Sequence, residues 1–265
     1  MKLKVYWISV LVIIFVFIVV KNIPAQWGLW LANAPIQMSG ISGTLWQGKA
    51  ASAVVPLQNN TSFALGEVQW NLSPWSLLTA SPCADLKTKL DDQQISGIAC
   101  AGLSGDVQLE NAQIAVPAKV AEVFAPIVEI QGDILLHVEN LNFSNNRIEK
   151  LSGSGSWNGA RFYNSTSWVG LGTLGFEFGE DGQGGVNAKV FDVEGPLQLQ
   201  LNSQFDLVGG YNTQGEVSLR PNAPTEIADL LNNYTNVSRE VQEVLSLFVE
   251  RKGRDQYSVR WVNPQ

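Results

Sequence analysis

Ile41-Ser42-Gly43-Thr44-Leu45-Trp46-Gln47-Gly48-Lys49-Ala50 is the stretch that decides how the chain is organised. A related stretch, Leu151-Ser152-Gly153-Ser154-Gly155-Ser156-Trp157-Asn158-Gly159-Ala160, follows 110 residues later. Allowing one inserted residue, both begin with Ile or Leu and Ser-Gly, and both end in Trp-x-Gly followed by alanine. Repeats of this kind determine an architecture, so they are weighed before single residues. We interpret each copy as a strand with a large tryptophan anchor, followed by a glycine where the backbone turns or bulges. A glycan or ligand platform built on the two tryptophans is the alternative.

The composition fits a sizeable exported domain. At 265 residues the chain can bury a substantial core, as one large β domain or two half-size ones. Its net charge is −7, and apart from Lys2, Lys4 and Lys21 it has 14 basic residues against 24 acidic ones. This balance excludes general nucleic-acid binding, which needs a cationic surface. It also argues against adhesion of the main domain to an anionic lipid surface.

The N-terminus predicts a membrane anchor. Residues 5–20 are apolar except for Ser9, lysines lie on both sides, and interfacial aromatic residues follow at 27–32. Sixteen helical residues rise about 24 Å, which is short of a full span. A cleaved signal peptide is the alternative, but Ile23-Pro24-Ala25 is a poor cleavage site and Lys21 ends the apolar run.

Three segments are therefore expected. A cytoplasmic tail covers 1–4, an uncleaved transmembrane signal anchor covers 5–25, and an exported β-rich domain covers 26–265. Within that domain the mostly polar residues 144–150 separate two halves, at 40–145 and 151–265.

Cys83 and Cys100 are consistent with export. They are even in number, 17 residues apart and in a turn-rich stretch, which predicts a disulfide. Such a bridge would stabilise the fold by roughly 3 kcal/mol in the loop-entropy model. Two free buried thiols are the alternative. A metal site is not expected, because the single histidine, His137, cannot complete a set of four ligands with them.

The fold class is predicted to be mainly β. Residues 197–207 give the longest alternation, in which leucine and phenylalanine oppose glutamine, asparagine and aspartate, and a helix would scatter these apolar residues. Similar patterns recur along the chain, so we expect a long antiparallel sheet, curled into a groove-like form over a hydrophobic interior. The few short helices are expected at 73–78, 117–125, 225–231 and 238–248.

Catalytic signatures are not recognisable. His137 has no Gly-x-Ser-x-Gly partner, and the glycine-rich stretch 170–185 lacks the Gly-Lys-Ser/Thr ending of a phosphate-binding loop. The paired acids Asp91-Asp92 and Glu180-Asp181 lie in predicted turns, where solvated acidic residues are common. We therefore expect no enzyme activity, no cofactor and no metal.

The chain resembles the general secretion pathway protein N family of the type II secretion system. The resemblance rests on the anchor, on Ser42–Ala50, on Trp70-Asn71-Leu72-Ser73-Pro74-Trp75, and on the echo at Trp157–Ala160. Gly195-Pro196-Leu197 and Leu219-Arg220-Pro221 follow in order, so the resemblance covers essentially the whole chain. More remotely, Gly-Thr-Leu-Trp-x-Gly-x-Ala is similar to AsmA-like envelope proteins, whose groove-shaped sheets are associated with lipid handling.

The resemblance implies a single-pass protein of the inner membrane, with most of the chain in the periplasm. It implies a non-enzymatic component that supports the export of folded proteins through contacts with other secretion subunits. The alternative is a lipid- or hydrophobe-binding module of the AsmA-like type, so lipid is a second candidate partner. The residues expected to matter are structural, namely Gly43, Trp46, Gly48, Trp70, Pro74, Trp75, Trp157 and Gly159, together with the Cys83–Cys100 disulfide.

Overall fold

A computed structural model of the chain describes ten stretches of residues. These are residues 2–27, 36–57, 61–79, 81–102, 105–123, 129–164, 166–206, 210–221, 223–236 and 246–263. The chain divides into two compact units, Met1–Gly102 and Leu103–Gln265, which we call unit 1 and unit 2. Residues 144–150, the predicted boundary between halves, instead include the turn of the hairpin formed by β8 (Ile130–Ser144) and β9 (Arg147–Tyr163).

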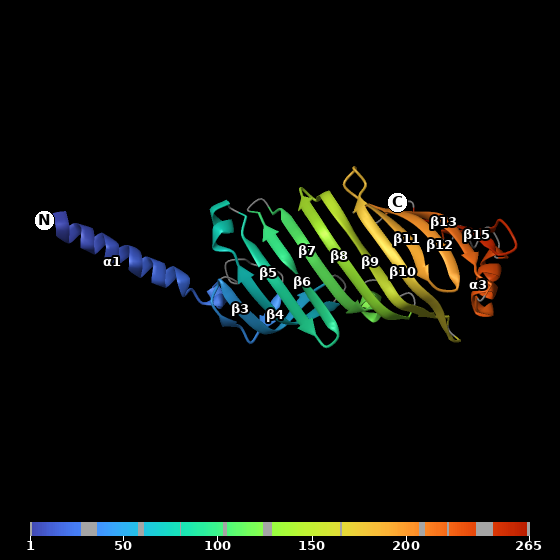
Figure 1. Cartoon of the computed structure of the whole chain (residues 1–265), viewed down its shortest axis with the longest axis horizontal. Coiled ribbons are helices and arrows are strands. Elements are labelled where there is room, and N and C mark those ends of the chain that lie inside the picture. The colour runs from blue at the N-terminus through green and yellow to red at the C-terminus, as the bar shows by residue number, and fades with distance from the viewer. Residues whose placement is uncertain are drawn as a thin grey trace. The chain divides into compact units, whose positions relative to one another are not determined.

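Unit 1 begins with the helix α1 (Lys2–Lys21) and continues as an antiparallel sheet (Figure 1). The strands lie in the order β1-β3-β4-β5-β6, and β2 pairs with β3. Their bounds are β1 Gln37–Ser39, β2 Ser42–Gly43, β3 Gln47–Pro56, β4 Ser62–Leu72, β5 Cys83–Leu90 and β6 Gln93–Ala101. The short 3-10 helix η2 (Pro74–Thr79) connects β4 to β5, which confirms the helical turn predicted there.

Unit 2 is a second run of antiparallel strands, ordered β7-β8-β9-β10-β11-β12-β13-β15-β14. The remaining bounds are β7 Val107–Pro117, β10 Trp168–Glu180, β11 Val186–Glu194, β12 Leu197–Phe205, β13 Tyr211–Leu219, β14 Leu247–Arg251 and β15 Gln256–Asn263. The 3-10 helix η3 (Ala118–Val123) follows β7, and the α-helix α3 (Thr225–Thr235) follows β13. A mainly β fold with large antiparallel pairing and few helices is thus confirmed.

The alternation in the sequence accounts for these strands. In β12, Leu197 and Ser203 are buried while Gln198, Gln200 and Asn202 are exposed, as expected for a strand with one packed face. The glycine-rich stretch forms β10 and the turn after it. At Gly175 an added Cβ would lie 2.5 Å from the ring of Phe191 on the neighbouring strand, so this position needs a glycine. The glycine leaves room for that ring to cover the sheet.

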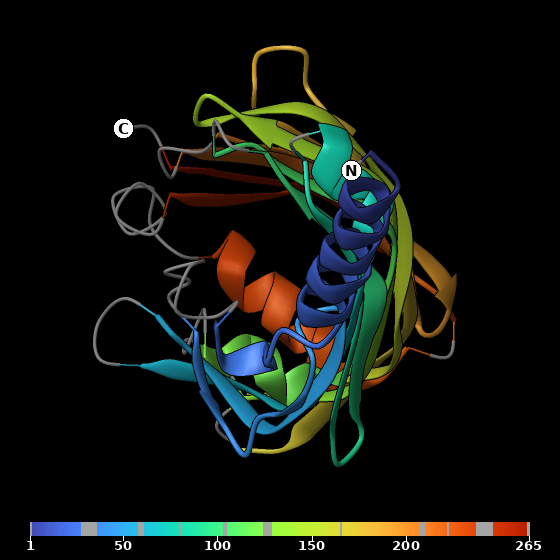
Figure 2. The same cartoon turned by 90° about the vertical axis from the view of Figure 1, so that its left-hand side faces the viewer.

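A small apolar core in unit 2 forms where α3 lies against one face of the sheet (Figure 2). Val169, Leu197, Val217 and Ile227 are buried there, from β10, β12, β13 and α3 respectively. Phe162, Leu171, Leu199, Leu219, Leu231 and Val259 pack around them. α3 therefore covers the apolar side of these strands.

Three expectations are not confirmed. Among the described residues, no helix combines the length and the apolar character needed to cross a membrane, so the predicted anchor at 5–25 stays a prediction, as does the curl of the sheet into a groove. The predicted helix at 238–248 lies mostly outside the described residues, and its last two residues belong instead to strand β14. They pair with β15, since Leu247 lies opposite Trp261 and Phe248 opposite Arg260.

Candidate functional site: a tryptophan-pinned junction at the end of α1

The stretch Ile41–Ala50 forms a tight connection between β2 and β3. Thr44 N–H donates to the carbonyl of Gln47 at 2.8 Å, and Gln47 N–H donates to the Thr44 hydroxyl at 3.2 Å. Gly43 has φ +95°, and a Cβ there would lie 2.5 Å from the Gln47 carbonyl oxygen. Only glycine fits this left-handed position without strain, which accounts for the Ser-Gly-Thr sequence.

Trp46 joins this connection to α1. Its indole Nε1–H donates to the carbonyl of Val20 at 2.8 Å, and Leu45 N–H donates to the carbonyl of Ile23 at 2.8 Å. Val20 is in the last turn of α1, where carbonyl groups have no partner within the helix. The tryptophan thus donates a hydrogen bond to a carbonyl group at the end of α1 and connects that end to the start of β3.

Trp70 on β4 supports Trp46 from the neighbouring strand. Its Nε1–H donates to the carbonyl of Leu45 at 3.2 Å, and its ring lies over Gly48, where an added Cβ would be 2.3 Å from ring atom Cζ2. Leu72 N–H, also on β4, donates to the carbonyl of Trp46 at 2.7 Å. The predicted residues Gly43, Trp46, Gly48 and Trp70 therefore belong to one hydrogen-bonded junction, which we call the α1 junction.

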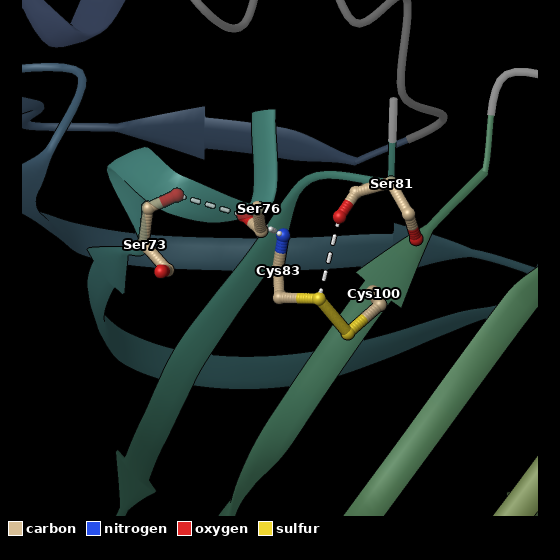
Figure 3. Close-up of a disulfide and its surroundings, with 5 residues drawn as sticks. All are labelled: Ser73, Ser76, Ser81, Cys83 and Cys100. Atoms are coloured by element: carbon tan, nitrogen blue, oxygen red, sulfur yellow. Dashed lines mark hydrogen bonds between the residues drawn. A yellow bond between two sulfur atoms is a disulfide. The ribbon is translucent and has the colours of Figure 1, made fainter. Parts of the chain in front are cut away.

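η2 continues from this junction to the disulfide (Figure 3). Ser73 N–H donates to the carbonyl of Cys83 at 2.9 Å. The Ser76 hydroxyl donates to the carbonyl of Ser73 at 2.7 Å and accepts from Cys83 N–H at 2.8 Å. Sequence reasoning did not identify Ser76, because its partners are set by the return of β5.

The predicted disulfide is confirmed. Cys83 on β5 lies directly opposite Cys100 on β6, and their sulfur atoms are bonded. Cys83 Sγ also contacts the carbonyl oxygen of Ser81 at 3.4 Å. The bridge closes the end of the β5–β6 hairpin beside η2 (Figure 3).

η2 displays one of the predicted tryptophans to solvent. Pro74 is the first residue of η2, where its missing N–H is not needed, and Trp75 follows with 78% of its surface exposed. Trp75 therefore packs little against the sheet, and it differs from Trp46 and Trp70, which are half-buried.

The tryptophan of the second copy of the motif makes a similar indole-to-carbonyl hydrogen bond in unit 2. Trp157 on β9 donates from Nε1–H to the carbonyl of Gln131 on β8 at 2.9 Å. This acceptor is 26 residues upstream, the same separation as between Trp46 and Val20. Gly159 has φ +58° and is exposed. The structure does not bring Trp157 and Gly159 into the α1 junction, because β8 and β9 belong to unit 2.

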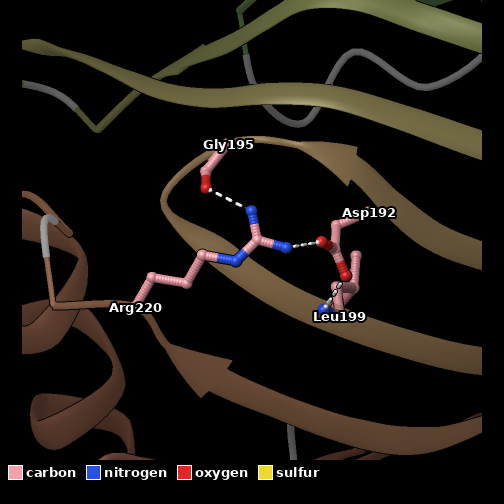
Figure 4. Close-up of polar contacts among 4 residues, drawn as sticks. All are labelled: Asp192, Gly195, Leu199 and Arg220. Atoms are coloured by element: carbon pink, nitrogen blue, oxygen red, sulfur yellow. Dashed lines mark hydrogen bonds and ion pairs between the residues drawn. The ribbon is translucent and has the colours of Figure 1, made fainter.

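A charged cluster that the sequence did not predict joins β11 to the chain between β13 and α3 in unit 2 (Figure 4). Arg220 Nη2 forms an ion pair with Asp192, while Nη1 donates to the carbonyl of Gly195 at 2.9 Å. Asp192 also accepts from Leu199 N–H at 2.7 Å. The Asp192 side chain is only 10% exposed. Because Arg220 contacts both Asp192 and Gly195, the cluster connects the β11–β12 turn to the chain that enters α3.

The paired acids Glu180 and Asp181 both accept hydrogen bonds from backbone N–H groups. Leu151 N–H donates to Glu180 at 2.9 Å and lowers the pKa of that carboxyl. Asp181 accepts from Gln183 N–H at 2.7 Å and Gly185 N–H at 2.8 Å, which lowers its pKa. Hydrogen bonds to the ionised form have this effect. Asp181 thus holds the β10–β11 turn, while Glu180 joins the end of β10 to β9.

The described residues offer little for chemistry or metal binding. His137 lies in the middle of β8, opposite Gln113 on β7 and Ser154 on β9. Within the described stretches, no three His, Cys, Asp or Glu side chains gather into a set that could hold a metal ion. The contacts around the α1 junction connect the end of α1 to η2, which carries the exposed Trp75, and to the disulfide-closed β5–β6 hairpin.

Comparison with known proteins identifies the family. The profile described as "Type II secretion system (T2SS), protein N" matches residues 34–246. The type II secretion system protein N of Vibrio cholerae serotype O1 is 26% identical over 214 residues, which covers 75% of this chain and 81% of that protein. The protein of the same name from Aeromonas hydrophila is 26% identical over 223 residues, covering 79% of this chain and 80% of that one. No solved structure gives a significant match. The chain belongs to the type II secretion system protein N family.

Proposed function

We propose that this component of the type II secretion system is a non-catalytic, membrane-tethered subunit. α1 holds it in the inner membrane, and the rest of the chain lies in the periplasm and contacts other secretion subunits. The observation that carries the proposal is the apolar surface of α1 joined to the α1 junction. Every side chain from Leu11 to Val20 is exposed, including Phe15 at 66% and Phe17 at 67%.

The apolar character of α1 supports the tether. Between Lys4 and Lys21 its 16 residues rise about 24 Å, which is somewhat less than the hydrocarbon core of a bilayer. Apolar side chains on all sides of a helix are typical of a segment that is surrounded by lipid or protein. Lys2 and Lys4 lie in the first turn of α1, before its apolar run, so the positive-inside rule keeps the N-terminus in the cytoplasm.

The disulfide supports the periplasmic location. Disulfides form and persist in oxidising compartments such as the bacterial periplasm, and they are rare in the cytosol. Cys83 and Cys100 are bonded to each other at the edge of unit 1, on the C-terminal side of α1. The disulfide therefore supports export of the chain that follows α1.

A polar hollow on unit 2 is the proposed contact surface. It is lined mostly by polar residues of β12, β13 and β15, among them Gln200, Gln214, Glu216 and Ser258, with Leu199, Phe248 and Val259 among its apolar members. Rows of amide, hydroxyl and carboxylate groups suit hydrogen bonds with a protein partner. This lining gives less support to the alternative, acyl-chain binding, which needs an apolar groove.

Site-specific photo-crosslinking tests the proposal. A photoreactive amino acid at Gln214 in the full chain should give crosslinks to secretion subunits in living cells, and the same group at Asp92 in the exposed β5–β6 turn serves as the matched control. Crosslinks from neither position, together with normal secretion in a deletion strain, would contradict the proposed role. Crosslinks from Gln214 to phospholipid would favour the lipid-binding alternative.

A further inference from the structure

We infer that Trp75 on η2, together with Trp27 beyond α1, forms a collar that seats unit 1 in the headgroup layer of the bilayer. The inference rests on the proposed membrane tether and goes beyond it, because it assigns a lipid-binding surface to the folded part of the chain. Trp75 is 78% exposed and Trp27 is 66% exposed. Tryptophan favours this layer because its ring is apolar and its N–H is polar.

Hydrogen bonds link the chain just before Trp75 to the end of α1. Val20 in the last turn of α1 accepts from Trp46, and Trp46 in turn accepts from Leu72 N–H at 2.7 Å. Trp75 follows Leu72 by three residues, a distance of at most about 11 Å along an extended chain. Trp27 is also linked to the junction, because its backbone N–H donates to the carbonyl of Pro24 at 3.1 Å, and Pro24 pairs with Thr44. Both tryptophans thus lie where a membrane helix would emerge.

The support beneath Trp75 is rigid. Ser76, its neighbour, is bonded to both Ser73 and Cys83, and Cys83 is tied to Cys100 by the disulfide. A tryptophan that is held in place and exposed to solvent is arranged for a binding surface, since a merely structural tryptophan would bury its ring. The disulfide then has a role in the collar, because it fixes the chain that presents the ring.

Charge distinguishes the two units and favours a lipid surface beside unit 1. After α1, unit 1 has three lysines against four acidic residues, a net charge of −1, whereas unit 2 has 11 basic against 20 acidic residues, a net charge of −9. Anionic lipids repel strongly acidic segments. The acidic balance of the chain therefore belongs mainly to unit 2, and the nearly neutral unit 1 is the unit compatible with a membrane surface.

Fluorescence quenching in vesicles tests the collar. The full chain is reconstituted into phosphatidylethanolamine and phosphatidylglycerol vesicles, and the emission of Trp75→Phe is subtracted from that of the unsubstituted protein. Lipids brominated near the headgroup end of the acyl chain should abolish most of the difference emission, and aqueous iodide should quench it weakly. Trp261→Phe is the matched control, because Trp261 is 41% exposed but lies in unit 2. The difference emission of Trp261 should be quenched by iodide and should not be quenched by the brominated lipid.

The outcomes separate the collar from the tether. Failure of the unsubstituted protein to float with the vesicles would overturn the tether and the collar together. Flotation with a Trp75 emission that iodide quenches as strongly as that of Trp261 would overturn the collar alone. Shielding of Trp75 only in native membranes that contain the other secretion subunits would also overturn it, because the occupant would then be a protein.

Discussion

Replacing Gly48 with alanine tests the α1 junction most sharply, because the structure leaves no space for a Cβ. The added atom would lie 2.3 Å from Trp70 Cζ2, 2.8 Å from Trp70 Cε2 and 2.9 Å from the Ser42 carbonyl oxygen. The Trp70 ring has to move, which breaks its hydrogen bond to Leu45. Overpacking costs about 1–3 kcal/mol, and the lost hydrogen bond about 1 kcal/mol more. We expect the junction to lose about 2–4 kcal/mol of stability.

Amide hydrogen exchange of the full chain measures this loss locally. The amides of Leu45 and Leu72 report on the junction, since they bond to Ile23 and Trp46. A loss of 2 kcal/mol corresponds to roughly 30-fold faster exchange. Gly170→Ala is the matched control, because a Cβ at Gly170 meets nothing within 4 Å. Unchanged exchange of both amides in Gly48→Ala, equal to that in the control, would refute the packing argument.

Three further predictions concern other parts of the chain. Reduction of the disulfide, or Cys83→Ser with Cys100→Ser, should lower the stability of unit 1 by roughly 3 kcal/mol. Reductant should lower the melting temperature of the unsubstituted protein; the double variant should melt at that lower temperature with or without reductant, and an unchanged melting temperature would contradict the role of the bridge. Arg220→Met should cost about 1 kcal/mol, since the pair is partly exposed, and should speed proteolysis between β11 and α3; cleavage at the unsubstituted rate would contradict the role of the ion pair. The pKa values of Glu180 and Asp181 are lowered from the ordinary values of 4.5 and 3.8. The ionised carboxylates therefore stabilise the fold at neutral pH, and this stabilisation is lost as the pH falls from the ordinary pKa values through the lowered ones. Glu180→Gln with Asp181→Asn should flatten the acid branch of the unfolding profile of unit 2, and an unchanged acid branch would contradict the capping role.

Much of the fold follows from local patterns. The alternation at 197–207 predicts β12, and Asp91-Asp92 between two polar-apolar runs predicts the β5–β6 hairpin. The cysteine spacing predicts the disulfide, because a hairpin places Cys83 and Cys100 directly opposite each other. Each of these depends on contacts within a few strands, which the sequence pattern contains.

Tertiary contacts account for what could not be predicted. The strand at Leu247–Arg251 follows from pairing with β15, and an apolar run of this length is compatible with helix or strand. The partner of Arg220 is 28 residues upstream, and the hairpin that brings Asp192 to it leaves no signal in the spacing. The same holds for the α1 junction. The motif identifies Trp46 as an anchor, but only the structure shows that the indole donates to Val20 at the end of α1.

The central claim is that the chain serves the secretion system from a membrane tether. The most direct measurement is affinity purification of the tagged full chain from cross-linked cells, compared with residues 28–265 exported behind a cleavable leader. Secretion subunits should be recovered with the full chain from the inner-membrane fraction, and their recovery should fall sharply when α1 is absent. Recovery of no secretion subunits with the full chain would contradict the account, as would equal recovery without α1.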